Sequence, residues 1–594
     1  MTGEWEYAKK TKLAILYILN DFCQGAEHWM MTNLRPEGSD SYGAVQGGRL
    51  LCAVAVSYSL IRTADIFSEE ERKRFYAMAE FLLRYMLDLR DRTEWTPEEA
   101  QSGCSNWQTD MCAGVGYLMM ALPDFPNRHI WLNNANTVLL AQLKLKVNHD
   151  GSWPESIRYH HAALERFAGY AKVLKKATGE NWFETTPLGD MFRYAIEMQT
   201  PGYGYFGGRI GTPPFGDHAL GDGEEFGYFP VFIPEIAERN PKLADRIRAV
   251  WTAAGTPAKR LWGESIVLEN LMVSATSSAS SSPCLLNSTA DFPDAGIYIF
   301  RRHSGKQTSY FAIMSSPRPI AHGHLDQGSF ILYAGSVPLV MDSGIEGYFD
   351  SSTSWHICSY SHACVQFAAK KNYVPASRIE PINLSAGTFS LERGWVDVPR
   401  TSQVLEVRFE EKWESIKIEI ANPKGTGRHI RSVVHIEELD IYLIRDEIKE
   451  YDGKMLFSLP VAALHSHVDG SYIQAECSYG MVLDAVFLSG VDSIVIDRGR
   501  STPFFPGEDS QVSYMHYIRA VADAANGFLT VLSPRHGEEP EIKVIWEPDG
   551  SVCLRTVHGA VRLEPAYYWR TDAARGLLTC MKPSLSEATT HEAG

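Results

Sequence analysis

Several features are scarce or missing in this sequence, and each absence removes a class of protein. Basic residues are outnumbered, since 56 lysines and arginines stand against 72 aspartates and glutamates, for a net charge of −16. A nucleic-acid-binding chain would show a basic patch or stripe, so we expect no nucleic-acid partner. No apolar run approaches the roughly 20 residues of a membrane-spanning helix, so we expect no membrane partner.

Cysteine motifs and a secretion signal are also lacking. The ten cysteines are scattered without a CxxC pair, which leaves a thiolate zinc site or a redox motif unsupported. The N-terminal stretch has only a short apolar run broken by polar residues, without a signal-peptide pattern. We therefore expect reduced thiols and a cytoplasmic location, with a mature secreted or periplasmic chain as the alternative. The sequence leaves the oligomeric state open.

Two halves of the chain have different hydrophobic periods. Up to about residue 265, apolar residues recur at helical spacing, and Ser68 before an acidic first turn is a predicted helix N-cap. The helical segments come in pairs, which is typical of a toroid or solenoid of helical hairpins. Beyond a serine-rich linker at 275–283 the period becomes two, as in GIYIFRR and GSFILYAG, which predicts an antiparallel β-sandwich.

The predicted domain limits follow from this change of period. We place a helical toroid over residues 1–270, an antiparallel β-sandwich over 284–575 and a weakly ordered tail over 576–594. The fold class is therefore α+β and multidomain.

Alternating histidines precede an apolar strand in the second half. His322, His324 and Asp326 alternate in HGHLD, so they point to one side of an extended chain. Asp342 ends the next apolar run and His362 enters another strand, so neighbouring strands can bring these residues together. Two imidazoles and a carboxylate suit zinc or a similar ion. A buried histidine–aspartate hydrogen-bond network without metal explains the same residues.

Polar residues also gather at two predicted helix starts in the helical half. Asn106 and Trp107 stand before an apolar helix, and Arg158, Tyr159 and His160 crowd the first turns of a later one. Capping alone explains either cluster. Arginine, tyrosine and histidine together, on a helix otherwise apolar on one face, favour the wall of a cleft.

The motifs SNW, DGSWPESxRYH, HGHLD, VPLVMDSG and SHACV together resemble the heparinase II/III superfamily of polysaccharide lyases. That group includes heparin, broader glycosaminoglycan and oligoalginate lyases. The resemblance covers most of the chain in the same order and is strongest over 317–365. It implies an incomplete (α/α) toroid followed by an antiparallel β-sandwich. It also implies an anionic polysaccharide or oligosaccharide as the partner.

The resemblance assigns catalytic roles to three residues. Asn106 would bind and neutralise the carboxylate of the substrate, Tyr159 would be the catalytic tyrosine and His322 the catalytic histidine. The implied reaction is β-elimination on a uronic-acid polymer, which yields unsaturated oligosaccharides.

The same resemblance implies a metal site in the β half. Its ligands would be His324, Asp342 and His362. We expect a divalent ion, zinc with manganese as the alternative, in a structural role, because β-elimination needs no activated water. Asp326 is then expected to orient a histidine rather than to bind the ion.

Four further residues make up the predicted substrate-binding set. We infer Arg158 and Arg209 from their charge, since cations near the carboxylate stabilise the enolate-like charge of the transition state. Trp107 and His160 complete the set. Arg158 and His160 are also expected to lower the pKa of Tyr159, so that it can act as a base.

Three alternatives remain open from the sequence. We favour glycosaminoglycans (hyaluronan, chondroitin sulfate or heparan sulfate) over alginate, because Trp107 stands where alginate-type members often carry histidine. A glycoside hydrolase on a similar toroid would use a pair of carboxylates, for which Glu155 and Asp110 are candidates. A non-catalytic carbohydrate-binding protein would leave polyuronates unchanged.

Overall fold

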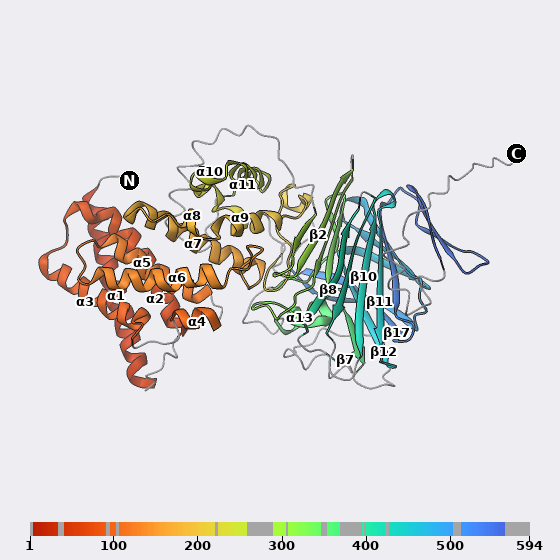
Figure 1. Ribbon diagram of the computed structural model, residues 1–594, viewed down its shortest axis with the longest axis horizontal. Helices are drawn as coiled ribbons and strands as arrows, with labels where there is room; N and C mark the ends of the chain where they lie inside the picture. The colour runs from red at the N-terminus through yellow and green to blue at the C-terminus, as the bar shows by residue number, and fades with distance from the viewer. Residues whose placement is uncertain are drawn as a thin grey trace. The chain divides into compact units, whose positions relative to one another are not determined.

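The computed structural model describes residues 4–33, 41–90, 96–102, 106–219, 224–257, 289–304, 307–345, 353–368, 395–396, 400–410, 412–421, 427–502 and 513–564. Helices dominate the first part and antiparallel strands the second (Figure 1), which confirms the predicted change of period. The predicted linker at 275–283 and the tail at 576–594 lie outside the described residues. Within those ranges, no helix has the length and apolar character that a membrane span requires.

The chain divides into two units by its internal contacts. The first comprises residues 1–199 and 223–285, and the second comprises residues 200–222 and 286–594. The 200–222 segment therefore departs from the predicted limits, because it precedes the linker in sequence yet belongs with the strands. The Tyr203 hydroxyl, for example, donates a hydrogen bond to Ser478 Oγ at 3.3 Å.

The helical unit is built from helices that pack against one another in pairs. They are α1 (Trp5–Asn33), α2 (Ser41–Ile61), α3 (Glu69–Leu87), α4 (Pro97–Ser102), α5 (Asn106–Ala121), α6 (Arg128–Leu145), α7 (Ile157–Thr178), α8 (Trp182–Thr185), α9 (Leu188–Glu197), α10 (Ile233–Arg239) and α11 (Pro241–Ala253). The predicted N-cap at Ser68 is confirmed. Ser68 Oγ accepts from the Glu71 backbone N–H at 3.1 Å, and Glu71 Oε2 accepts from the Ser68 N–H at 2.8 Å.

Helix α5 lies against α2, α6 and α7 within this unit. Its crossing with α2 depends on two glycines, because a Cβ at Gly114 would stand 2.1 Å from the carbonyl oxygen of Gly48. Only backbones without side chains approach so closely. This crossing fixes the position of α5, whose first residue is Asn106.

The second unit is dominated by two antiparallel sheets. One has the strand order β1-β2-β3-β4-β5-β12-β17-β16, with β6 also paired to β12 and β7 paired to β6. Its strands are β1 (Ala290–Phe292), β2 (Ile297–Ser304), β3 (Gln307–Met314), β4 (Phe330–Ala334), β5 (Val337–Val340), β6 (Val365–Ala368), β7 (Trp395–Val396), β12 (Lys454–Val461), β16 (Ser493–Ser501) and β17 (Ser513–Asp523).

The other sheet has the order β13-β14-β15-β18-β11-β10-β9-β8. Its strands are β8 (Ser402–Phe409), β9 (Trp413–Ile420), β10 (Arg428–Ile436), β11 (Ile441–Lys449), β13 (Ala463–Asp469), β14 (Tyr472–Cys477), β15 (Met481–Phe487) and β18 (Phe528–His536). A small separate sheet follows, formed by β19 (Lys543–Trp546), β20 (Val552–Thr556) and β21 (Gly559–Leu563).

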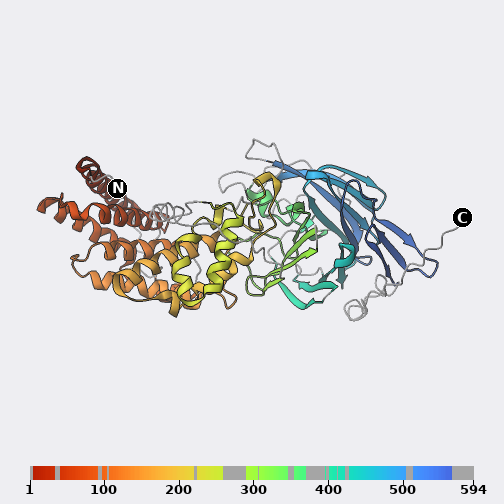
Figure 2. The same cartoon turned by 90° about the horizontal axis from the view of Figure 1, so that it is seen from above.

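The two large sheets face each other across an aromatic core, as a sandwich requires. Phe311 of β3 stacks on Tyr442 of β11 with ring centroids 5.3 Å apart. Phe457 of β12 meets Phe528 of β18 at 5.7 Å. Figure 2 shows these strands, in green to blue, from a second direction. The HGHLD stretch lies in the connection between two of these strands, β3 and β4, rather than on a strand itself.

Candidate functional site

One buried carboxylate ties the starts of α5 and α7 together. Glu155 Oε1 accepts hydrogen bonds from the Asn106 backbone N–H at 3.0 Å and from the indole N–H of Trp153 at 2.8 Å. Glu155 is 5% exposed, and a carboxylate so buried needs such donors. The bridge therefore fixes Asn106 relative to the turn that leads into Tyr159.

His160 holds the same turn in place through two further hydrogen bonds. Its Nδ1 accepts from the Trp153 backbone N–H at 3.0 Å, and its Nε2–H donates to the Met191 carbonyl of α9 at 3.1 Å. The ring is fully buried, and burial lowers the pKa of His160 to about 4. A buried neutral imidazole with both nitrogens engaged holds the turn in place rather than carrying a positive charge near Tyr159. The predicted part of His160 in substrate binding stays a prediction.

The other candidates in the helical unit keep part of their surface accessible. Tyr159 and Trp107 are half-buried and Arg158 is exposed, whereas Asn106 is 6% exposed. Arg158 thus carries a permanent positive charge at the position directly before Tyr159. Its role in substrate binding stays a prediction, as does that of Trp107.

Asp110, one of the two carboxylates considered for a hydrolase, lies between two arginines. Its Oδ2 pairs with Arg49 Nε at 2.7 Å, and its Oδ1 pairs with Arg166 Nε at 2.9 Å. Both carboxylate oxygens of Asp110 are therefore already engaged in ion pairs. With Glu155 engaged as well, the structure counts against the hydrolase alternative.

In the β-containing unit, the three predicted metal ligands come together. His324, Asp342 and His362 each offer one ligand atom, and these atoms lie within 4.8 Å of one another. All three residues are buried. His362 Nδ1 lies 2.7 Å from Asp342 Oδ2, while Asp342 Oδ1 accepts from the Gly344 N–H at 3.0 Å.

The tautomer of the His324 ring is the one that a metal ligand requires. Its Nε2 lies 3.1 Å from Asp217 Oδ1, so the proton belongs on Nε2 and the lone pair on Nδ1. Burial lowers the pKa of His324, which keeps the ring neutral. Among the described residues, Nδ1 is a buried atom without a hydrogen-bond partner. A neutral imidazole with a lone pair inside a His₂Asp cluster fits a divalent cation.

His322 has an unusual backbone conformation beside this cluster. Its φ is +56°, which non-glycine residues rarely adopt. The His322 carbonyl accepts a hydrogen bond from the Asp217 N–H at 2.7 Å. Such conformations persist where the surroundings hold them in place, as they do here.

Asp217 is the important residue that the sequence interpretation did not assign. Its side chain holds His324 and its backbone holds His322. No sequence pattern links Asp217 to the histidines, because 107 residues separate it from His324. The role expected of Asp326 falls to Asp217. Asp326 itself is buried, which raises its pKa to about 7, and its Oδ2 lacks a hydrogen-bond partner within the described ranges.

Arg431 of β10 anchors the two segments that carry the histidines. Its Nη1 donates to the carbonyls of Gly328 at 2.5 Å and Ala363 at 2.6 Å. Its Nε and Nη2 pair with Asp446 at 2.7 and 3.0 Å, and the whole group is buried. Gly328 follows HGHLD and Ala363 follows His362, so one arginine sets the spacing of both.

Two predictions concern residues that belong to different units. Arg209 lies in the 200–222 segment, where its Nε donates to the Phe206 carbonyl at 2.8 Å. His322 also belongs to the β-containing unit, whereas Asn106 and Tyr159 belong to the helical one. Action of His322 and Tyr159 on one substrate therefore stays a prediction, as does substrate binding by Arg209.

Comparison with known proteins finds two family models in the chain. Residues 53–226 match the model described as heparinase II/III N-terminus, and residues 286–459 match heparinase II/III-like, C-terminal. No curated protein sequence matches the chain.

Solved structures with a similar fold include a heparinase III, at 15% identity and a TM-score of 0.61, covering 87% of this chain and 74% of the other. Another is the heparan sulfate lyase HepC from Pedobacter heparinus, at 15% identity and a TM-score of 0.60, covering 95% and 79%. These similarities confirm the predicted fold class, an incomplete (α/α) toroid followed by an antiparallel β-sandwich.

Proposed function

Because the chain belongs to the heparinase II/III-like superfamily of polysaccharide lyases, we propose that it cleaves uronate-containing glycosaminoglycans by β-elimination. The observation that carries this proposal is the Glu155 bridge. It holds the start of α5, with Asn106, against the turn that leads into Tyr159. An amide and a phenol positioned by one buried carboxylate suit a reaction that needs charge neutralisation and proton transfer at neighbouring atoms.

The proton to be removed lies on the carbon next to the uronate carboxylate and is barely acidic. Its removal places negative charge on that carboxylate, so donors aimed there lower the barrier. We assign this work to Asn106, with Arg158 as the nearby cation. The buried environment of Asn106 strengthens its hydrogen bonds, because little water competes there.

A base must take that proton, and an acid must protonate the leaving glycosidic oxygen. In our proposal Tyr159 does both when the proton and the leaving group lie on one face of the sugar. His322 is the base when they lie on opposite faces. Tyr159 is half-buried, so its hydroxyl need not be displaced from a core to meet substrate.

A divalent cation, zinc in our proposal, would be held by His324, Asp342 and His362. When bound, it supplies positive charge that fixes these three side chains. Asp217 keeps His324 in the required tautomer and holds the His322 backbone. The residues of the chain, rather than the ion, then carry out the proton transfers.

The test is product formation by the purified full chain. Hyaluronan, chondroitin sulfate, heparan sulfate and alginate are supplied separately, and the ultraviolet absorbance of the unsaturated uronate product is followed. We expect product from at least one glycosaminoglycan. Product from alginate alone would move the substrate to the alginate class, and no product from any polymer would overturn the lyase proposal.

The Tyr159→Phe variant tests the catalytic assignment. It removes only the hydroxyl, so we expect turnover to fall at least about a hundredfold with an unchanged circular dichroism spectrum. Tyr7→Phe, at an exposed position of α1, is the matched control and should keep full activity. Full activity in Tyr159→Phe would exclude the phenol from the chemistry.

A further inference from the structure

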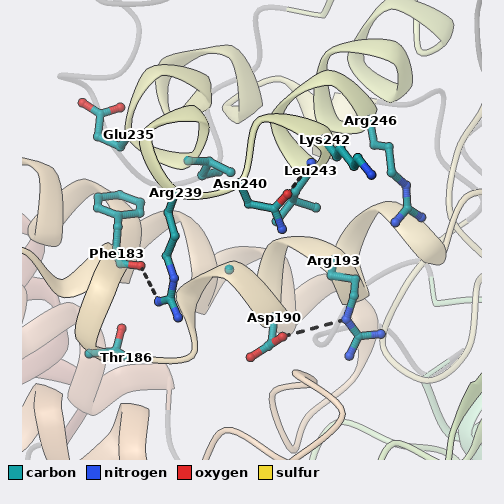
Figure 3. Close-up of a pocket in the computed structure, with 12 residues that line it drawn as sticks. Phe183, Thr186, Asp190, Arg193, Glu235, Arg239, Asn240, Lys242, Leu243 and Arg246 are labelled. Carbon is teal, nitrogen blue, oxygen red and sulfur yellow. Dashed lines mark hydrogen bonds and ion pairs between the residues drawn. The ribbon is translucent and has the colours of Figure 1, made fainter.

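The helical unit contains a concave site that is lined by none of the residues assigned above. It is a cavity of about 470 Å³ between α8–α9 and the α10–α11 pair. Figure 3 shows Arg239, Lys242 and Arg246 descending from α10 and α11 toward Asp190 and Arg193 on α9. Four cationic side chains therefore line one cavity of a chain whose net charge is −16.

Two of these cations already have carboxylate partners. Arg246 pairs with the buried Glu197. Arg193 Nε lies 3.9 Å from Asp190, and its guanidinium also donates to the Asp150 carbonyl at 2.9 Å. These two arginines are thus largely neutralised and shape the cavity wall.

The other two cations are not neutralised. Arg239 Nη1 donates only to backbone carbonyls, those of Phe183 at 3.4 Å and Glu184 at 2.7 Å. Lys242 is exposed. In the part of the chain that the structure describes, neither Arg239 nor Lys242 has a carboxylate within ion-pair distance. Two such cations lining a concave surface favour an anion from outside the protein.

The volume of the cavity and the residues that line it indicate what kind of anion could bind there. A volume of about 470 Å³ is within the range of small-molecule sites and exceeds the need of a bare inorganic ion. Phe183 and Leu243 add apolar surface to the lining. Arginine matches the planar oxygens of carboxylate and the oxygens of sulfate through paired hydrogen bonds.

We propose that this cavity is an accessory binding site for an acidic sugar unit, with its carboxylate or sulfate ester between Arg239 and Lys242. The choice of a saccharide ligand rests on the proposed function. The site itself is separate from Asn106 and Tyr159, so a saccharide held there is retained by the enzyme without being cleaved.

The test is protection of Lys242 from chemical acetylation in the full chain, read by mass spectrometry. The probe is a sulfated uronate disaccharide, with Lys144, exposed on α6, as the internal reference. At a disaccharide concentration about ten times Kd, we expect the acetylation rate of Lys242 to fall about tenfold, while that of Lys144 is unchanged. Arg239→Gln should weaken the affinity for the disaccharide, read from the concentration that half-protects Lys242, at least about tenfold.

Several results would overturn this proposal. They are an unchanged acetylation rate of Lys242, protection that survives Arg239→Gln with equal affinity, or equal protection by inorganic sulfate at the same concentration. A second variant, Lys242→Gln, alters only an exposed side chain, and calorimetry should show that it loses disaccharide affinity. The lyase assay on the same preparation separates the two proposals, because product formation does not depend on Lys242 protection.

Discussion

The buried imidazole of His160 makes the stability of the helical unit depend on pH. In the folded chain both ring nitrogens are used, Nδ1 as an acceptor from Trp153 and Nε2–H as a donor to Met191. Protonation of Nδ1 would destroy the first hydrogen bond and bury a charge. The pKa of His160 is accordingly lowered to about 4 from the ordinary value of 6.5.

The sign and size of the effect follow from linkage. Because the folded pKa lies below the unfolded one, the unfolded chain binds the proton more readily, and stability falls as the pH falls through 6.5 toward 4. With one pKa unit worth about 1.4 kcal/mol, the loss from this group is about 2 kcal/mol between about pH 7.5 and about pH 5. The contribution is fully present above pH 6.5.

The assay is urea unfolding followed by circular dichroism in the helical band, at both pH values. The wild type is compared with His160→Asn, which cannot titrate in this range. The stability advantage of the wild type over His160→Asn should shrink by about 2 kcal/mol at the lower pH. His129→Gln, at an exposed position of α6, is the matched control and should leave the pH dependence unchanged. An advantage that stays constant across the two pH values would refute the buried neutral imidazole.

Two further predictions concern the β-containing unit. Asp217→Ala removes the acceptor at His324 Nε2, so zinc affinity measured by chelator competition should weaken about 10- to 100-fold, whereas Asp217→Asn keeps an oxygen there and should lose less. Equal zinc affinity in wild type and Asp217→Ala would contradict this role. Arg431→Met leaves the buried Asp446 with His429 as its partner but without a permanently charged one, and should cost about 3–5 kcal/mol in the free energy of unfolding. Arg428→Met, on the exposed part of the same strand, should cost less than about 1 kcal/mol, and similar costs for both would argue against the anchoring role.

The fold could be predicted from the sequence because its evidence is local. Helical and strand periods are set by residues a few positions apart, and so is the capping box at Ser68. The position of the 200–222 segment could not be predicted in this way. Its membership of the β-containing unit depends on contacts such as Tyr203 with Ser478, which are 275 residues apart in the chain.

The site residues, too, could be predicted only where they lie close together in the sequence. His324, Asp342 and His362 lie within 40 residues of one another on strands and turns that the sequence pattern marks, so their proximity was predictable. Asp217 was not, because the chain between it and His324 includes the end of the helical unit. The burial of His160 was not predictable for a related reason. A polar residue in a first helical turn is normally exposed, and the burial of this ring depends on hydrogen bonds with the Trp153 N–H and with the Met191 carbonyl of a later helix.

The two buried carboxylates nearest the predicted chemistry share one property. Glu155 receives the Asn106 and Trp153 N–H groups, and Asp217 holds His324 with its side chain and His322 with its backbone. Such hydrogen bonds hold each carboxylate in one place, which suits a supporting role. In the proposed mechanism the protons are moved by Tyr159 and His322, both of which are half-buried. Carboxylates in a supporting role, with a phenol and an imidazole for the proton transfers, fit the proposed β-elimination. A hydrolase would need the opposite arrangement, with one carboxyl group protonated and poised at the leaving oxygen.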